Sequence, residues 1–125
     1  ESAFPIFINR YNKLVNQLKK LSKKIVIITG GLHLKNGKFY NSTYIFENGN
    51  MKIIDKHILV PFGEYIPLPF FQKEINEIFF AGASDYFTAN SFGEFSIKNY
   101  KFINAICYEA TVEELYKLKP HFIVA

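Results

Sequence analysis

The feature that most constrains the fold is the run Ile25-Val26-Ile27-Ile28-Thr29, which is entirely β-branched and is bounded by Gly30-Gly31, where we expect it to end. Side chains of this kind favour an extended backbone, and the run is too short to be a buried helix. Because polar residues do not alternate with apolar ones, the run predicts a strand that is covered on both faces. We therefore expect the chain to fold as an α/β structure in which other elements pack on each side of this strand.

A helix is predicted before this strand, because apolar residues recur at spacings of three and four from Phe7 to Leu21. Five lysines lie on the other face or just after it, which is a third of the 15 lysines and arginines in the chain. We interpret this cluster as a solvated helix face rather than as a patch for nucleic acid or anionic lipid. The five are Lys13, Lys19, Lys20, Lys23 and Lys24.

Two turn signals predict that the sheet continues by hairpins. Asn36-Gly37 favours a tight turn before a strand over residues 39–46, and Asn48-Gly49-Asn50 favours a second turn before a strand over residues 51–55. The segment from Lys56 to Pro69 contains several prolines and Gly63, so it is predicted to be an ordered loop. Long loops of this kind usually carry function, which makes this one the first place to look for a site.

The second half of the chain repeats the alternation of helix and strand. We predict a helix from Pro69 to about Phe80, strands over residues 92–97 and 101–107, a short helix over 111–119, and a buried strand from Phe122 to Ala125. The chain begins beside Ala3-Phe4-Pro5 and ends within an apolar strand, so we expect both ends to be cut through a larger fold. Such a cut would expose sheet edges and favour self-association of the isolated piece. No apolar run reaches the ~18–20 residues of a membrane span.

Cys107 is the only cysteine in the 125 residues, which excludes an intrachain disulfide framework and a zinc site made of cysteines. It lies at a predicted turn from strand to helix, where a nucleophile is often exposed beside unpaired backbone amides. The alternative is a small core side chain at the end of a buried strand. A reactive thiol also needs a base or a cation, and the loop that begins at Lys56 offers a carboxylate and an ammonium.

The segment from Lys56 to Pro67 resembles the lysine loop of the nitrilase superfamily. Its form Leu59-Val60-Pro61-Phe62-Gly63-Glu64-Tyr65 resembles one branch in particular, the bacterial apolipoprotein N-acyltransferases. Further segments are similar to that family and occur in the same order along the chain, from the first residue to the cysteine. They are Glu1-Ser2-Ala3-Phe4-Pro5, Thr29-Gly30, Tyr40-Asn41-Ser42 and Ile106-Cys107-Tyr108-Glu109.

The resemblance implies that residues 1–125 are a partial carbon-nitrogen hydrolase domain, part of a nitrilase-like αββα sandwich of four layers that is truncated at both ends. It implies a catalytic triad in which Glu1 is the general base, Lys56 stabilises the oxyanion and Cys107 is the nucleophile. Glu64 matches a further essential carboxylate that holds the lysine or the base in place. Supporting roles near the nucleophile are implied for Tyr108 and Glu109.

The activity implied by the resemblance is transfer of a fatty acyl chain from a phospholipid, through a thioester on Cys107, to the N-terminal amine of an apolipoprotein. It implies no cofactor, no metal and no nucleic acid, and a link to the membrane through segments absent from this chain. The implied location is the bacterial inner membrane, with the catalytic domain on the periplasmic face. Two alternatives remain open, a soluble nitrilase-type amidase and an inactive fragment that only folds or associates.

Overall fold

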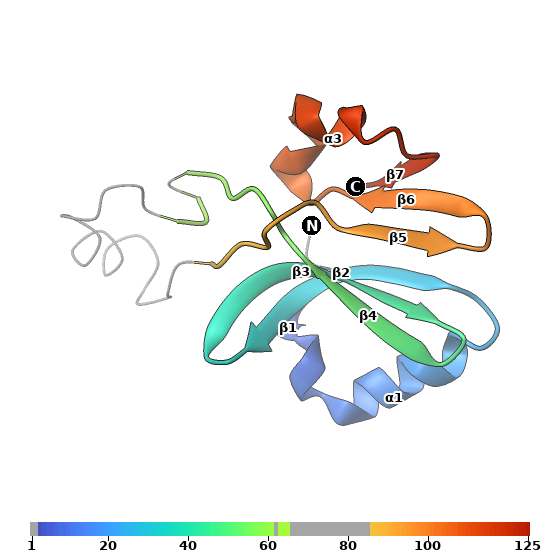
Figure 1. Cartoon of the computed structure of the whole chain (residues 1–125). Coiled ribbons are helices and arrows are strands. Elements are labelled where there is room, and N and C mark those ends of the chain that lie inside the picture. The colour runs from blue at the N-terminus through green and yellow to red at the C-terminus, as the bar shows by residue number, and fades with distance from the viewer. Residues whose placement is uncertain (1–2, 62, 66–85) are drawn as a thin grey trace.

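Four layers make up the part of the chain that the computed structural model describes, residues 3–61, 63–65 and 86–125 (Figure 1). Helix α1 (Asn12–Leu21) covers a four-stranded sheet, a three-stranded sheet lies on the other side, and η2 (Cys107–Thr111) and α3 (Glu113–Lys117) cover that second sheet. This order of layers confirms the expected α/β fold with its αββα arrangement. The helix predicted from Pro69 to Phe80 lies outside the described residues.

The first sheet has the order β1-β2-β3-β4, with β1 (Phe4–Phe7) parallel to β2 (Ile27–Lys35). The hairpins join β2 to β3 (Lys38–Glu47) and β3 to β4 (Asn50–Asp55), as the two turn signals predicted. Asn36, Gly37, Asn48 and Gly49 all have positive φ angles, from 50° to 81°, which is the conformation that Asn-Gly turns favour.

Strand β2 continues through Gly30-Gly31, so the prediction that these glycines end the strand is wrong. A Cβ atom added to Gly31 would overlap Cδ1 of Ile8, a fully buried side chain of the 3₁₀ helix η1 (Ile8–Arg10). Glycine is therefore needed at position 31 because Ile8 packs closely against it, and not because the chain turns there. The first helix also begins later than predicted, at Asn12, because residues 4–7 form an edge strand, where Pro5 is tolerated.

The second sheet has the order β5-β6-β7, formed by Glu94–Ile97, Tyr100–Asn104 and Phe122–Val124. β5 and β6 form an antiparallel hairpin, and β6 and β7 are parallel, joined by the crossover through η2 and α3. Strand β6 ends at Asn104, three residues earlier than predicted. Cys107 therefore lies just beyond the strand, at the start of the crossover.

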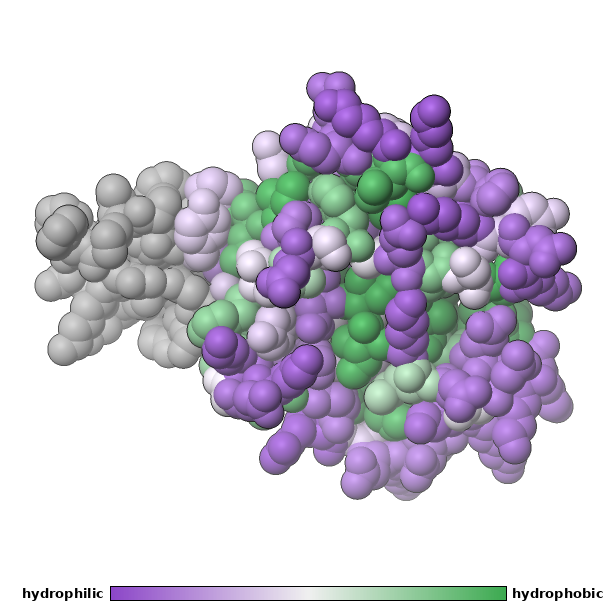
Figure 2. Space-filling view, viewed as in Figure 1, coloured by the Kyte–Doolittle hydropathy of each residue, from purple (hydrophilic) through white to green (hydrophobic). Residues whose placement is uncertain are grey.

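Buried apolar side chains form three clusters, one in each space between neighbouring layers. On one face of the molecule, a band of hydrophobic residues crosses the middle, where β4 and β5 lie, between hydrophilic residues above and below (Figure 2). The apolar space between the two sheets therefore reaches the surface on this side. From α1 outward, the clusters contain Ile8, Val15, Tyr44 and Phe46; Ile45, Ile54 and Phe95; and Ile103, Ala105 and Leu115.

Gly93 shows how closely the two sheets pack, and it provides a test of the fold. A Cβ atom added to it would overlap Cγ2 of Ile54 and lie 3.0 Å from Cβ of that side chain. Because Ile54 is buried in the central cluster, Gly93→Ala is expected to reduce the free energy of unfolding by about 1–3 kcal/mol, measured by denaturant unfolding. Adding Ile54→Val to Gly93→Ala should recover part of this loss. Full stability of Gly93→Ala alone would contradict the packing.

Candidate active site

Lys56 follows strand β4 directly, and its side chain is almost completely buried, with 1% of its surface exposed. Its backbone N–H donates to the carbonyl of Asn41 at 2.8 Å, and its carbonyl accepts from the N–H of Ala89 at 2.8 Å. The side-chain Nζ lies 2.6 Å from Oε2 of Glu64. A buried ammonium needs such a partner, because an unpaired charge in the interior is strongly unfavourable.

The carboxylate of Glu64 organises the loop that the sequence singled out. Besides Lys56, it accepts hydrogen bonds from Nδ2 of Asn41 at 3.2 Å and from the backbone N–H of Val60 at 3.0 Å. The N–H of Glu64 in turn donates to the carbonyl of Val60 at 2.9 Å, which closes the loop into a tight turn. Burial raises the pKa of Tyr86, and the nearby negative charge of Glu64 raises it further.

Cys107 lies at the predicted turn from strand to helix, as the first residue of η2, and its side chain is exposed. Its φ angle is +55°, in the left-handed region that L-residues other than glycine, asparagine and aspartate rarely adopt. An exposed thiol on a residue of positive φ, between a strand and a helical turn, has the geometry of a nucleophile elbow. The thiol is therefore not the small core side chain that was the alternative. The neighbouring Tyr108 is also exposed, at 48%.

Glu109 connects the lysine loop to the cysteine turn. Its side chain is 1% exposed, and Oε1 accepts from the backbone N–H groups of His57 at 2.7 Å and Ile58 at 3.0 Å. Oε2 accepts from the N–H of Ile106 at 2.7 Å. His57 and Ile58 come directly after Lys56, and Ile106 comes directly before Cys107. One carboxylate therefore holds together the two segments that carry the predicted lysine and the predicted cysteine.

Only a supporting role was expected for Glu109, and the three backbone hydrogen bonds that its carboxylate accepts were not foreseen. A signal was present, because a glutamate three residues into a helical turn often bonds back to the N–H that precedes the turn. Asn41 was expected only as part of a segment that resembles the family, and its hydrogen bond to Glu64 was not foreseen. Glu1, the predicted general base, lies outside the described residues.

A second polar network lies at the same end of the first sheet, around Asp55. Oδ1 of Asp55 is 2.7 Å from Nδ1 of His33 and accepts from Oγ of Ser42 at 2.6 Å. Burial raises the pKa of Tyr44 to about 12, and the charge of Asp55 adds to the shift, while a hydrogen bond with Asn9 opposes it. Strands β2, β3 and β4 are thereby tied together immediately before Lys56.

The described residues contain no group of three or more His, Cys, Asp or Glu side chains placed to hold a metal ion. Within residues 3–61, 63–65 and 86–125, no helix combines the length and the apolar character needed to cross a membrane. The arrangement that the structure does hold is an exposed thiol, a buried ammonium and two buried or half-buried carboxylates. Such a set can stabilise the negative charge that develops when a thiolate attacks a carbonyl group.

In fold, the chain is similar to solved structures of two kinds. It matches a glutamine-dependent NAD+ synthetase from Acinetobacter baumannii with a TM-score of 0.63 and 21% identity, over 94% of this chain and 20% of the other. It matches a CN-hydrolase superfamily protein from Xanthomonas campestris with a TM-score of 0.55 and 12% identity, over 78% of this chain and 31% of the other. These matches show that the fold is of the CN-hydrolase kind.

In sequence, the chain is similar to curated proteins named apolipoprotein N-acyltransferase, although no family model matches it. Identity is 46% to the protein of Wolinella succinogenes over 99% of this chain, 43% to that of Campylobacter jejuni over 94%, and 37% to that of Helicobacter pylori over 96%. The chain spans 26% to 30% of the length of these relatives. It therefore belongs to the apolipoprotein N-acyltransferase family and corresponds to one segment of those longer proteins.

Proposed function

We propose that residues 1–125 are a partial carbon-nitrogen hydrolase domain of an enzyme that transfers a fatty acyl chain from a phospholipid to the N-terminal amine of an apolipoprotein. The observation that carries the proposal is the set of three hydrogen bonds by which Glu109 holds the Lys56 segment beside the Cys107 turn. The similarity to the curated relatives supports the choice of reaction. The protein containing this chain would act at the bacterial inner membrane, on its periplasmic face.

In the first half of the reaction, Glu1 accepts the proton of the Cys107 thiol as the sulfur attacks the ester carbonyl of the phospholipid. The oxyanion that forms is stabilised by the ammonium of Lys56 and by the backbone N–H of Tyr108, since the first N–H groups of a helical turn have no partner within the helix. When the intermediate collapses, the ester C–O bond breaks and the released alcohol takes the proton from Glu1. The acyl chain remains on the sulfur as a thioester.

In the second half, the amine of the lipoprotein attacks the thioester carbonyl and gives a proton to Glu1. The C–S bond breaks, an amide forms, and the thiolate of Cys107 is protonated again. Glu64 holds the Lys56 ammonium in place through both halves, because the carboxylate lies 2.6 Å from Nζ. Glu109 and Tyr108 support the turn that carries the nucleophile. The chemistry requires no cofactor.

The proposal predicts a stable acyl-enzyme. When the protein that contains residues 1–125 is incubated in detergent with phospholipid alone, its mass is expected to rise by one long acyl group, located to Cys107 and removed by hydroxylamine. The thioester should outlast attack by water, because transfer requires it to survive until the amine binds. Intact-protein mass spectrometry measures the adduct, and a Glu1→Gln variant is expected to form none.

The same experiment separates this proposal from a soluble amidase. An amidase needs no long-lived thioester with a lipid chain, so it would show no adduct and would hydrolyse a small amide in a reaction that depends on Cys107. A protein that gives neither an adduct nor hydrolysis would be the inactive alternative. Either result would overturn the acyltransferase proposal while leaving the fold assignment intact.

A further inference from the structure

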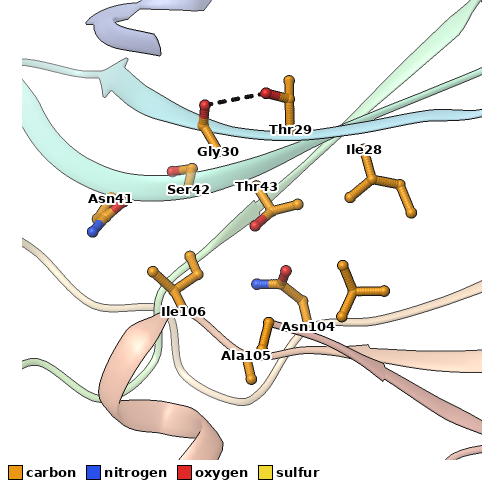
Figure 3. Close-up of a pocket in the computed structure, with 11 residues that line it drawn as sticks. Ile28, Thr29, Gly30, Asn41, Ser42, Thr43, Asn104, Ala105 and Ile106 are labelled. Carbon is orange, nitrogen blue, oxygen red and sulfur yellow. Dashed lines mark hydrogen bonds between the residues drawn. The ribbon is translucent and has the colours of Figure 1, made fainter. Parts of the chain in front are cut away.

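A small cavity lies between the two sheets, behind the turn that carries Cys107. Its volume is about 110 Å³, and its walls come from β2 and β3 on one side and from β6, the residues after it and the end of β7 on the other (Figure 3). Two of its lining residues, Asn41 and Ile106, also take part in the hydrogen bonds of Glu64 and Glu109 described above. Neither Lys56 nor Cys107 lines it.

Two polar side chains in this cavity have no hydrogen-bond partner among the described residues. Asn104 is 3% exposed and Thr43 is 6% exposed, and within the described part of the chain neither side chain makes a hydrogen bond or any other polar contact. Figure 3 shows the amide of Asn104 and the hydroxyl of Thr43 turned toward one another across the space. Buried polar groups in folded proteins nearly always have a partner, which is often an ordered water molecule.

The side chains that line the cavity determine which kind of molecule can bind in it. The lining residues in the described part of the chain include no charged side chain, so a metal ion or a small anion would lack a counter-charge there. An apolar molecule would leave the amide and the hydroxyl without partners. Water can donate to the amide oxygen and accept from the amide N–H or the hydroxyl, and at ~30 Å³ per molecule the space has room for about three.

We propose that this cavity binds a small cluster of ordered water molecules that bridge Thr43 of β3 to Asn104 of β6. The bridge fixes the separation of the two sheets close to both halves of the site. Thr43 stands two residues beyond Asn41, the partner of Glu64, and Asn104 stands three residues before Cys107. Water-mediated hydrogen bonds of this kind hold two surfaces together nearly as well as direct ones. This inference does not depend on the proposed acyl transfer.

A double-mutant cycle tests the bridge in the protein that contains residues 1–125. Thr43→Val and Asn104→Leu keep the approximate size of each side chain and remove its polar atoms. Each substitution alone therefore leaves the polar group of the unsubstituted residue buried without a full set of hydrogen-bond partners. Each is expected to lower the unfolding temperature by about 3–6 °C. The double variant should unfold within about 2 °C of the less stable single variant, because the second change removes a group that has already lost its bridge.

Thr111→Val is the matched control, since Thr111 is exposed and lies outside the cavity. The change in unfolding temperature caused by Thr111→Val should add to the change caused by Asn104→Leu. If the changes caused by Thr43→Val and Asn104→Leu were also additive, the proposed bridge would be overturned. A high-resolution crystal structure of the unsubstituted protein provides an independent check. Density for a water within about 3.2 Å of both the Asn104 amide and Oγ1 of Thr43 is expected. An empty cavity, or one filled by protein, would overturn the proposal even if a variant fails to fold.

Discussion

Cys107→Ala is expected to reduce acyl transfer to below about one thousandth of the unsubstituted rate in the protein that contains this chain. Without the sulfur no thioester can form, and no other group described at the site offers a comparable nucleophile. The unfolding temperature should stay nearly unchanged, because the side chain is small and exposed. Steady-state transfer from phospholipid to a lipoprotein peptide, together with thermal unfolding, measures both quantities.

The control for Cys107→Ala is Tyr116→Phe, an exposed change on α3 that removes one hydroxyl group. It should retain activity within a factor of about two, because its hydroxyl donates only to the carbonyl of Ala110. Near-normal transfer by Cys107→Ala would remove the thiol from the mechanism. Loss of activity accompanied by unfolding would assign Cys107 a structural role, for which its exposure gives no reason.

Glu109→Ala is expected to reduce the free energy of unfolding by about 3–6 kcal/mol, because three backbone N–H groups lose their acceptor at once. That is a large part of the roughly 5–15 kcal/mol by which a domain is normally stable. Glu109→Gln should reduce the free energy of unfolding by less, since the amide oxygen of glutamine can still accept hydrogen bonds from the backbone N–H groups on one side. Its amide N–H₂ group then faces an N–H donor on the other side. Denaturant unfolding of the three proteins gives the ranking.

Glu113→Ala provides the comparison for Glu109→Ala on a neighbouring segment. Glu113 pairs with Lys117 at 3.1 Å, but both side chains are mostly exposed, so its loss should change stability by less than about 0.5 kcal/mol. If Glu109→Ala were as mild as Glu113→Ala, the buried carboxylate would not be holding the two segments together. The proposed arrangement of Lys56 and Cys107 would then lose its main support.

The sequence predicted those helices and strands whose local residue preferences agree with the conformation that the rest of the fold requires. The hairpins of β2, β3 and β4 form where Asn36-Gly37 and Asn48-Gly49 occur, because those residues adopt positive φ angles at little cost. It failed where tertiary packing overrides local preference. Gly30-Gly31 looked like a strand end, yet β2 continues because Gly31 makes room for Ile8. Strand β1 was not foreseen because its four residues depend on pairing with β2.

For the candidate site, residue types and their order were predictable, but their connections were not. That Glu64 holds either the lysine or the base was implied by the resemblance, and the structure places its carboxylate 2.6 Å from Nζ of Lys56. Two of the three hydrogen bonds of Glu109 come from residues 51 and 52 positions away in sequence, and no local pattern encodes such a connection. The unpaired polar groups of Thr43 and Asn104 become visible only when the two sheets are assembled.

The long-range reach of Glu109 has a consequence for the order of events during folding. Its carboxylate bonds to His57, 52 residues away in sequence, whereas its bond to Ile106 spans only three residues. Contacts between distant segments close large loops and form slowly, so the turn around Cys107 can form early while its link to the lysine segment comes late. A partly folded chain therefore carries an exposed thiol that has not yet been brought beside the Lys56 segment.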